Sequence, residues 1–150
     1  MLIKKITSKN FLTGENEERE YRFHLSKPEI TDLEFDTEEK LSDKIKIVMA
    51  KKDDSAIYRI FKELIFKSYG EVSADGFRFI KEDADGKPLA KKFMQTDAYS
   101  QLFEELCSDE NAIVAFFKGI LPEGYTESKE YKEAEEQTKV MMANYLAADN

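Results

Sequence analysis

The chain has 150 residues, 41% of them hydrophobic and 36% charged, which suits one folded domain with a core of its own. Its formal net charge is -8 and its lysine pairs lie scattered among acidic residues, so nucleic acid and anionic membranes are excluded as general electrostatic partners. One cysteine excludes an intramolecular disulfide, and the lack of a signal peptide or of an apolar run approaching ~18 residues favours a cytoplasmic protein.

Residues 2–25 predict a β-hairpin. Tyr21, Phe23 and Leu25 alternate with polar residues, which is the period of a strand with one buried face. The alternation in the first strand is weaker, and Thr13-Gly14-Glu15-Asn16 is the turn between the two. Because an isolated hairpin is only marginally stable, we expect its apolar face to pack on helices.

Two helices are predicted to follow the hairpin. Ser26, Pro28 and Glu29 form a helix start, with a capping serine, a proline in the first turn and a glutamate three residues after the cap. Asp36 and Thr37 are expected to interrupt this short helix. A second helix is expected over residues 38–50, with its apolar residues on one side.

The stretch from Ser55 to Gly70 predicts a central helix that is apolar over more than half of its circumference. Ser55 is the expected N-cap, and Gly70 stands where a helix commonly ends in a left-handed turn. The main apolar row is expected to be core; it consists of Ile57, Ile60, Phe61, Leu64 and Ile65. A second face is a candidate contact for another protein; it consists of Tyr58, Phe66 and Tyr69.

Beyond Gly70 the periodic spacing of apolar residues is weaker, and farther along it becomes that of a helix again. Turns at residues 74–76 and 85–88 flank a piece that is either a short extended segment or an irregular loop. Thr96 predicts the N-cap of a helix that runs to about Cys107. Ser108 predicts the cap of the last core helix, which ends near Gly119.

From residue 123 the composition changes, so we divide the chain into a core domain, residues 1–122, and a hinge with an amphipathic C-terminal helix, residues 123–150. This helix either docks on the core or is held out for a partner. Its candidate partner contacts are Tyr131, Met141, Met142, Tyr145 and Leu146. The fold class predicted for the whole chain is mainly α, a small helical bundle with an N-terminal β-hairpin.

No catalytic, cofactor or metal site is predicted. His24 falls on the polar face of its strand, which favours a solvent-exposed residue over a catalytic base. Cys107 has no histidine nearby in sequence and is expected to be a semi-buried structural thiol. A loop beginning at Asp83 would place Pro88 sixth and Met94 twelfth, where calcium loops need glycine and glutamate. These observations favour a protein that is not an enzyme.

Three blocks of sequence carry a resemblance to a known family. They are YRFHLSKPEITDLE at residues 21–34, IFKELIFKSYGEVSADGFRFIK at 60–81 and FMQTDAYSQLFEELCSDENAIVAFFKGILPE at 93–123. In this order the blocks resemble the tail assembly chaperones of long-tailed bacteriophages and prophages, of the type found in phages of Gram-positive hosts.

The resemblance implies a non-catalytic protein of the host cytoplasm that is absent from the finished virion. It implies two partners, the tape measure protein, which it coats and keeps soluble, and the major tail tube protein, which it helps to recruit. Homo-oligomerisation stays open. The alternative is a structural tail or head-tail connector subunit that is retained in the virion, and mass spectrometry of purified particles separates the two.

Overall fold

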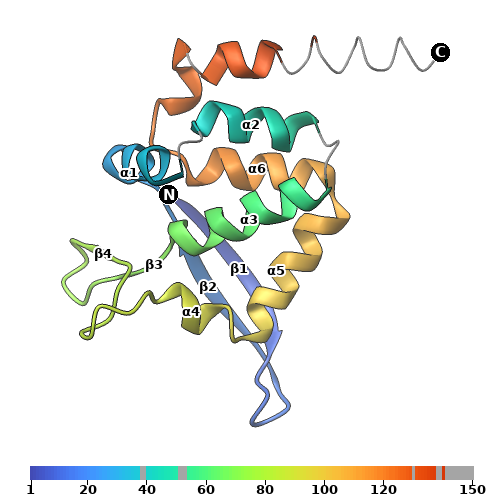
Figure 1. Ribbon diagram of the computed structural model, residues 1–150. Coiled ribbons are helices and arrows are strands. Elements are labelled where there is room, and N and C mark those ends of the chain that lie inside the picture. The colour runs from blue at the N-terminus through green and yellow to red at the C-terminus, as the bar shows by residue number, and fades with distance from the viewer. Residues whose placement is uncertain (38–39, 51–53, 130, 138–139, 141–150) are drawn as a thin grey trace. The chain divides into compact units, whose positions relative to one another are not determined.

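The computed structural model describes residues 1–150 except 38–39, 51–53, 130, 138–139 and 141–150 (Figure 1). The chain forms two compact units. The sheet unit consists of Met1–His24 and Leu64–Ile120, and the helical unit consists of Leu25–Glu63 and Leu121–Asn150. The predicted division between residues 122 and 123 stays a prediction. No helix among the described residues is long and apolar enough to cross a membrane.

The sheet unit contains an antiparallel sheet of four strands in the order β1-β2-β3-β4. Its strands are β1 (Leu2–Lys9), β2 (Asn16–Phe23), β3 (Tyr69–Val72) and β4 (Phe79–Ile80). The predicted hairpin is confirmed, since β1 and β2 pair from Leu2 with Phe23 to Lys9 with Asn16. The predicted helical bundle is wrong: two further strands extend the hairpin, so the fold is mixed α/β rather than mainly α.

The prediction of a helical bundle failed because Gly70 lies in a strand. Helix α3 (Asp54–Ser68) ends before it, and the chain continues as β3, in which Gly70 pairs with Arg22 of β2. A Cβ atom at Gly70 would lie 2.7 Å from the Phe79 ring and 2.8 Å from the Ile80 carbonyl oxygen. Glycine therefore permits the close approach of β4 here, and it is not the left-handed helix end that the sequence suggested.

Helices α4 (Ala90–Phe93), α5 (Asp97–Ser108) and α6 (Glu110–Ile120) complete the sheet unit. Both α5 and α6 contact β1. The Thr96 cap is confirmed, because its hydroxyl accepts from the Tyr99 N–H at 3.4 Å. The Ser108 cap is wrong: Ser108 belongs to α5, and Asp109 Oδ1 accepts from the Asn111 N–H at 2.9 Å instead.

Aromatic rings fill the core of the sheet unit. The Phe93 ring stacks on Tyr69 with 4.6 Å between ring centroids, and it meets the Phe23 ring edge to face at 5.6 Å. Phe23 meets Phe116 of α6 in the same manner at 5.3 Å. Phe93 thus packs α4 on β2 and β3, and Phe23 packs the sheet on α6.

The helical unit contains α1 (Lys27–Thr37), α2 (Leu41–Ala50) and most of α3. The start predicted for α1 is confirmed: Ser26 Oγ accepts from the Glu29 N–H at 3.3 Å, and Glu29 Oε1 accepts from the Ser26 N–H at 3.1 Å. Helix α1 continues through Thr37, where an interruption was expected. Helix α3 begins at Asp54, so Ser55 lies inside its first turn and is not the cap.

The main row of α3 is largely buried, as predicted. Ile57 is half-buried, whereas the other four members are buried: Ile60, Phe61, Leu64 and Ile65. Lys44 of α2 is also buried, and its Nζ lies 3.2 Å from Glu63 Oε1 of α3. After η1 (Tyr125–Glu127) the chain turns helical again at residues 129 and 131–137.

Candidate partner-binding surface

Backbone hydrogen bonds close the loop that joins β1 to β2, residues 10–15. The Asn10 N–H donates to the Glu15 carbonyl and the Gly14 N–H donates to the Asn10 carbonyl, both at 2.8 Å. Gly14 has a φ of 75°, which a residue with a side chain rarely adopts. Two backbone hydrogen bonds and a glycine thus close the loop.

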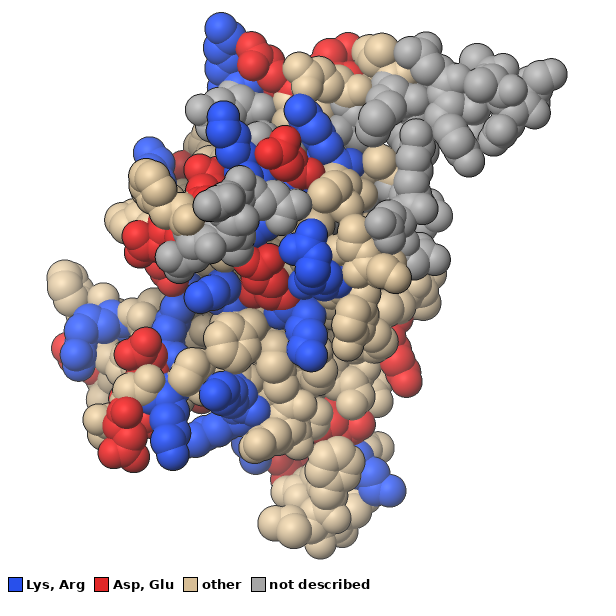
Figure 2. Space-filling view, in the orientation of Figure 1, with Lys and Arg blue, Asp and Glu red and all other residues tan. Residues whose placement is uncertain are grey.

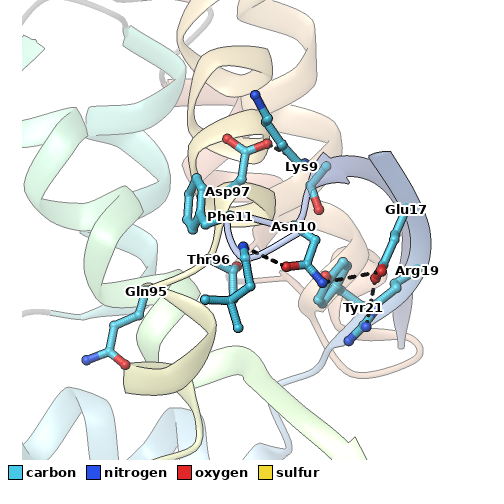
Figure 3. Close-up of a pocket in the computed structure, with 11 residues that line it drawn as sticks. Lys9, Asn10, Phe11, Glu17, Arg19, Tyr21, Gln95, Thr96 and Asp97 are labelled. Atoms are coloured by element: carbon cyan, nitrogen blue, oxygen red, sulfur yellow. Dashed lines mark hydrogen bonds and ion pairs between the residues drawn. The ribbon is translucent and has the colours of Figure 1, made fainter. Parts of the chain in front are cut away.

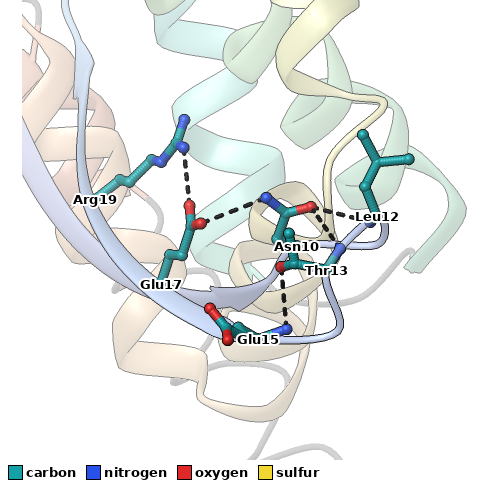
Figure 4. A network of polar contacts seen from close by, with 6 residues as sticks. All are labelled: Asn10, Leu12, Thr13, Glu15, Glu17 and Arg19. Carbon is teal, nitrogen blue, oxygen red and sulfur yellow. Dashed lines mark hydrogen bonds and ion pairs between the residues drawn. The ribbon is translucent and has the colours of Figure 1, made fainter.

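Side chains brace the same loop from inside. Asn10 Oδ1 accepts from the backbone N–H groups of Leu12 at 2.9 Å and Thr13 at 3.4 Å. Its Nδ2 donates to Glu17 Oε1 at 3.4 Å, and Arg19 Nη2 donates to Glu17 Oε2 at 2.8 Å (Figure 4). An asparagine that bonds to the backbone two and three residues ahead fixes a turn, so this loop is pre-organised.

The braced loop presents two apolar side chains to solvent. Phe11 is 68% exposed and Leu12 is 97% exposed. We call this pair the apolar tip. Neither side chain contributes much to the core. A loop that is already ordered loses less conformational entropy when it binds, so a contact made by this loop costs less free energy. The apolar tip is therefore suited to contact another protein.

A hollow of about 210 Å³ lies beside the apolar tip (Figure 3). Its lining comes from the end of β1 and the loop after it, from β2 and from the start of α5, and consists of Ser8, Lys9, Asn10, Phe11, Leu12, Glu17, Arg19, Tyr21, Gln95, Thr96 and Asp97. Asp97 Oδ2 accepts from the Lys9 N–H at 2.8 Å and so joins the start of α5 to the end of β1. Pockets for drug-sized ligands usually measure ~300–1,000 Å³, so this hollow suits a side chain of a partner better than a small-molecule substrate.

Charged side chains of both signs surround the apolar tip and the hollow beside it. Figure 2 shows Lys and Arg interspersed with Asp and Glu over the face in view. Among the described residues, no three His, Cys, Asp or Glu side chains lie where they could hold a metal ion. The surface thus offers an apolar contact in mixed polar surroundings, which is typical of a protein-protein interface.

A family model described as phage tail assembly chaperone matches residues 1–150. The chain belongs to the phage tail assembly chaperone family. This match confirms the resemblance seen in the three sequence blocks, whereas the restriction to phages of Gram-positive hosts stays a prediction. Comparisons with curated proteins and with solved structures gave no match.

The contact residues predicted for this chaperone fall into three groups. Tyr58 is exposed, and Phe66 is half-buried. Tyr69 and Tyr131 are buried, so neither side chain offers a surface contact. Four residues lie outside the described part of the chain: Met141, Met142, Tyr145 and Leu146. The apolar tip was missed because nothing in the local pattern distinguishes an exposed Phe-Leu pair from the end of a buried strand.

The two buried tyrosines have altered acidity. Burial, with a smaller effect of the Glu71 carboxylate, raises the pKa of Tyr69 well above its ordinary value. Burial, with a smaller effect of the Glu135 carboxylate, raises the pKa of Tyr131 to about 12. Both hydroxyls stay neutral at physiological pH, as expected of side chains in a packed interior.

His24 and Cys107 also differ from expectation. His24 is half-buried, its N–H donates to the Ser68 carbonyl at 2.8 Å, and its own carbonyl accepts from Lys81 Nζ at 2.6 Å. Its backbone thus joins the end of β2 to the end of α3. Cys107 is exposed rather than semi-buried, and partial desolvation raises the pKa of its thiol. A raised pKa makes a thiol less reactive, so this cysteine does not resemble a nucleophile.

Proposed function

We propose that this tail assembly chaperone acts without catalysis in the host cytoplasm, where it coats the tape measure protein and keeps it soluble. Tail tube subunits are recruited to this complex and displace the chaperone, which is then absent from the virion. The family match supports a role in tail assembly, and the braced apolar tip supports a role that depends on contact with another protein.

The observation that carries the proposal is Leu12, which is 97% exposed on a loop fixed by hydrogen bonds. A tape measure protein is long and helical, and an amphipathic helix offers an apolar stripe to such a contact. The hollow beside the tip can take a side chain from this stripe. Many copies that each bind weakly along one long helix hold it by avidity.

Changing Phe11 and Leu12 together to serine is expected to weaken binding of a tape measure fragment by ~10-fold or more. Burying a leucine or phenylalanine contributes ~1.5–3 kcal/mol, and ~1.4 kcal/mol corresponds to a factor of ten in affinity. Isothermal titration calorimetry measures the change. The fold should be unaffected, because both side chains are exposed and the braces of the loop remain.

Phe77→Ser is the matched control, since Phe77 is 87% exposed on the turn between β3 and β4 of the same unit. This variant should bind the fragment like the wild type. Equal affinity of the double variant and the wild type would show that the apolar tip is not part of the contact surface. A loss of affinity confined to Phe77→Ser would place the contact surface at the turn between β3 and β4 instead.

A further inference from the structure

Strand β1 lies at the edge of the sheet, so one side of its backbone has no neighbouring strand (Figure 1). Two hydrogen bonds near the end of the hairpin show which backbone groups face that side. The Asn10 N–H donates to the Glu15 carbonyl across the hairpin, whereas the Lys9 N–H donates to Asp97 Oδ2 and so points away from β2. Consecutive residues of a strand alternate in this respect. The odd-numbered residues of β1 therefore turn their N–H and C=O groups outward.

The outward backbone groups of Ile3, Lys5 and Thr7 have no hydrogen-bond partner in the described part of the chain. Strand β1 pairs with β2 over all 8 of its residues without a bulge, and it contains no proline. Bulges and prolines are common means by which proteins prevent another strand from pairing with an exposed edge. Asp97 occupies the edge only at Lys9. The middle of β1 can therefore accept one more strand.

The side chains along this edge define what it can bind. Ile3 and Lys5 are exposed on the outer face of the sheet, whereas α5 meets the opposite face, where Lys4 Nζ lies 2.6 Å from Glu105 Oε1. Lys9 shares the outer face, and neither it nor Lys5 forms an ion pair with a described residue. Two copies of β1 side by side would bring these basic rows together, which disfavours a second copy as the partner. An acidic residue opposite Lys5 and an apolar residue opposite Ile3 would be favourable.

We propose that the edge of β1 recruits the tail tube subunit by adding an extended segment of that subunit to the sheet. The segment carries an acidic residue and an apolar residue two positions apart, because such side chains share one face of a strand. The choice of the tube subunit rests on the proposed function. Of the two partners named there, the tape measure protein is helical, and a helix has already paired the backbone groups that an edge requires. Strand β1 leads into the apolar tip, so the subunit binds next to the proposed tape measure contact.

Backbone hydrogen exchange, followed residue by residue by NMR with and without purified tube subunit, tests the pairing. In the free chain the outward N–H groups of Ile3, Lys5 and Thr7 should exchange quickly, while those of Lys4 and Ile6, which face β2, should exchange slowly. Binding should slow the first three and leave the other two unchanged. If all five exchange at unchanged rates in a complex that still forms, the inference is wrong.

Substitutions at the edge give a second test. Thr7→Pro removes one outward N–H and places a ring at the edge, a position where an edge strand tolerates proline, and should weaken binding of the tube subunit ~10-fold. Thr7→Ala keeps the N–H and should bind like the wild type. Equal affinities of these two variants would contradict strand addition.

Loss of the lysine charge tests the acidic partner without changing the backbone. Lys5→Ala should weaken binding of the tube subunit about two- to fivefold, the size of effect expected for an exposed ion pair. Lys91→Ala, at an exposed lysine of α4 in the same unit, should have no effect. Equal losses in these two variants would overturn the proposed charge pairing. Because Lys5→Ala keeps the strand intact, it decides this point even if the proline variant unfolds.

This inference and the proposed function can fail separately, because a tape measure fragment is titrated in parallel. A chaperone that binds the fragment, but whose β1 amides the tube subunit does not protect, would contradict this inference alone. Protection by the tube subunit without any binding of the fragment would support this inference and contradict the coating of the tape measure protein. Protection of the same three amides in the free chaperone at rising concentration would assign the edge to a second copy and overturn the inference.

Discussion

Phe93→Ala is expected to destabilise the sheet unit by ~3–5 kcal/mol, the usual cost of removing a buried phenylalanine. The Phe93 ring is buried and contacts four other aromatic rings: Tyr21, Phe23, Tyr69 and Tyr99. Alanine would leave a cavity at the point where α4 meets the sheet. Whole domains are stable by only ~5–15 kcal/mol, so a loss of this size removes much of the stability.

Urea unfolding followed by near-ultraviolet circular dichroism measures this loss, since that signal reports on packed tyrosine and phenylalanine rings. Phe77→Ala is the matched control: Phe77 is 87% exposed, and its removal should change the stability by less than ~0.5 kcal/mol. A loss below ~1 kcal/mol for Phe93→Ala would mean that the aromatic core is not packed as described.

Lys44→Ala is expected to destabilise the helical unit by ~3 kcal/mol, at the low end of the ~3–5 kcal/mol seen when one partner of a buried ion pair is removed. The Lys44 side chain is 0% exposed and its ammonium group lies 3.2 Å from Glu63. The low end applies because Glu63 keeps some contact with water, which partly stabilises its charge after the lysine is lost.

A double variant separates loss of the pair from loss of packing. Lys44→Met with Glu63→Met removes both charges and keeps most of the volume, so it should cost less than the single change. Lys129→Ala breaks the exposed pair with Glu133 and should cost less than ~0.5 kcal/mol. Equal melting temperatures of Lys44→Ala and Lys129→Ala would contradict the buried ion pair.

The sequence predicted well those features that neighbouring residues determine. The cap of α1 depends on Ser26 and Glu29, which are three residues apart, and the cap of α5 depends on Thr96 and Tyr99. The hairpin followed from the alternation around Phe23. In each case the side chains that decide the structure are close together in the chain, so their spacing alone carries the information.

The features that were missed depend on residues far apart in the chain. Tyr69 belongs to a strand because it pairs with Phe23, and Gly70 is needed there because the Phe79 ring comes close. From residues 55–70 alone, the same two positions continue or end a helix. The candidate site was missed for a related reason, since the 97% exposure of Leu12 is a property of the folded chain and not of the residues next to it in sequence.

The most direct test of the account is the solubility of the tape measure protein when it is expressed with and without this chaperone. Expressed alone, the tape measure protein should be mostly insoluble. Expressed together, it should become soluble and copurify with several copies of the chaperone, as size-exclusion chromatography with light scattering would show. A tape measure protein that stays equally insoluble with the wild-type chaperone, or that copurifies with none of it, would contradict the account.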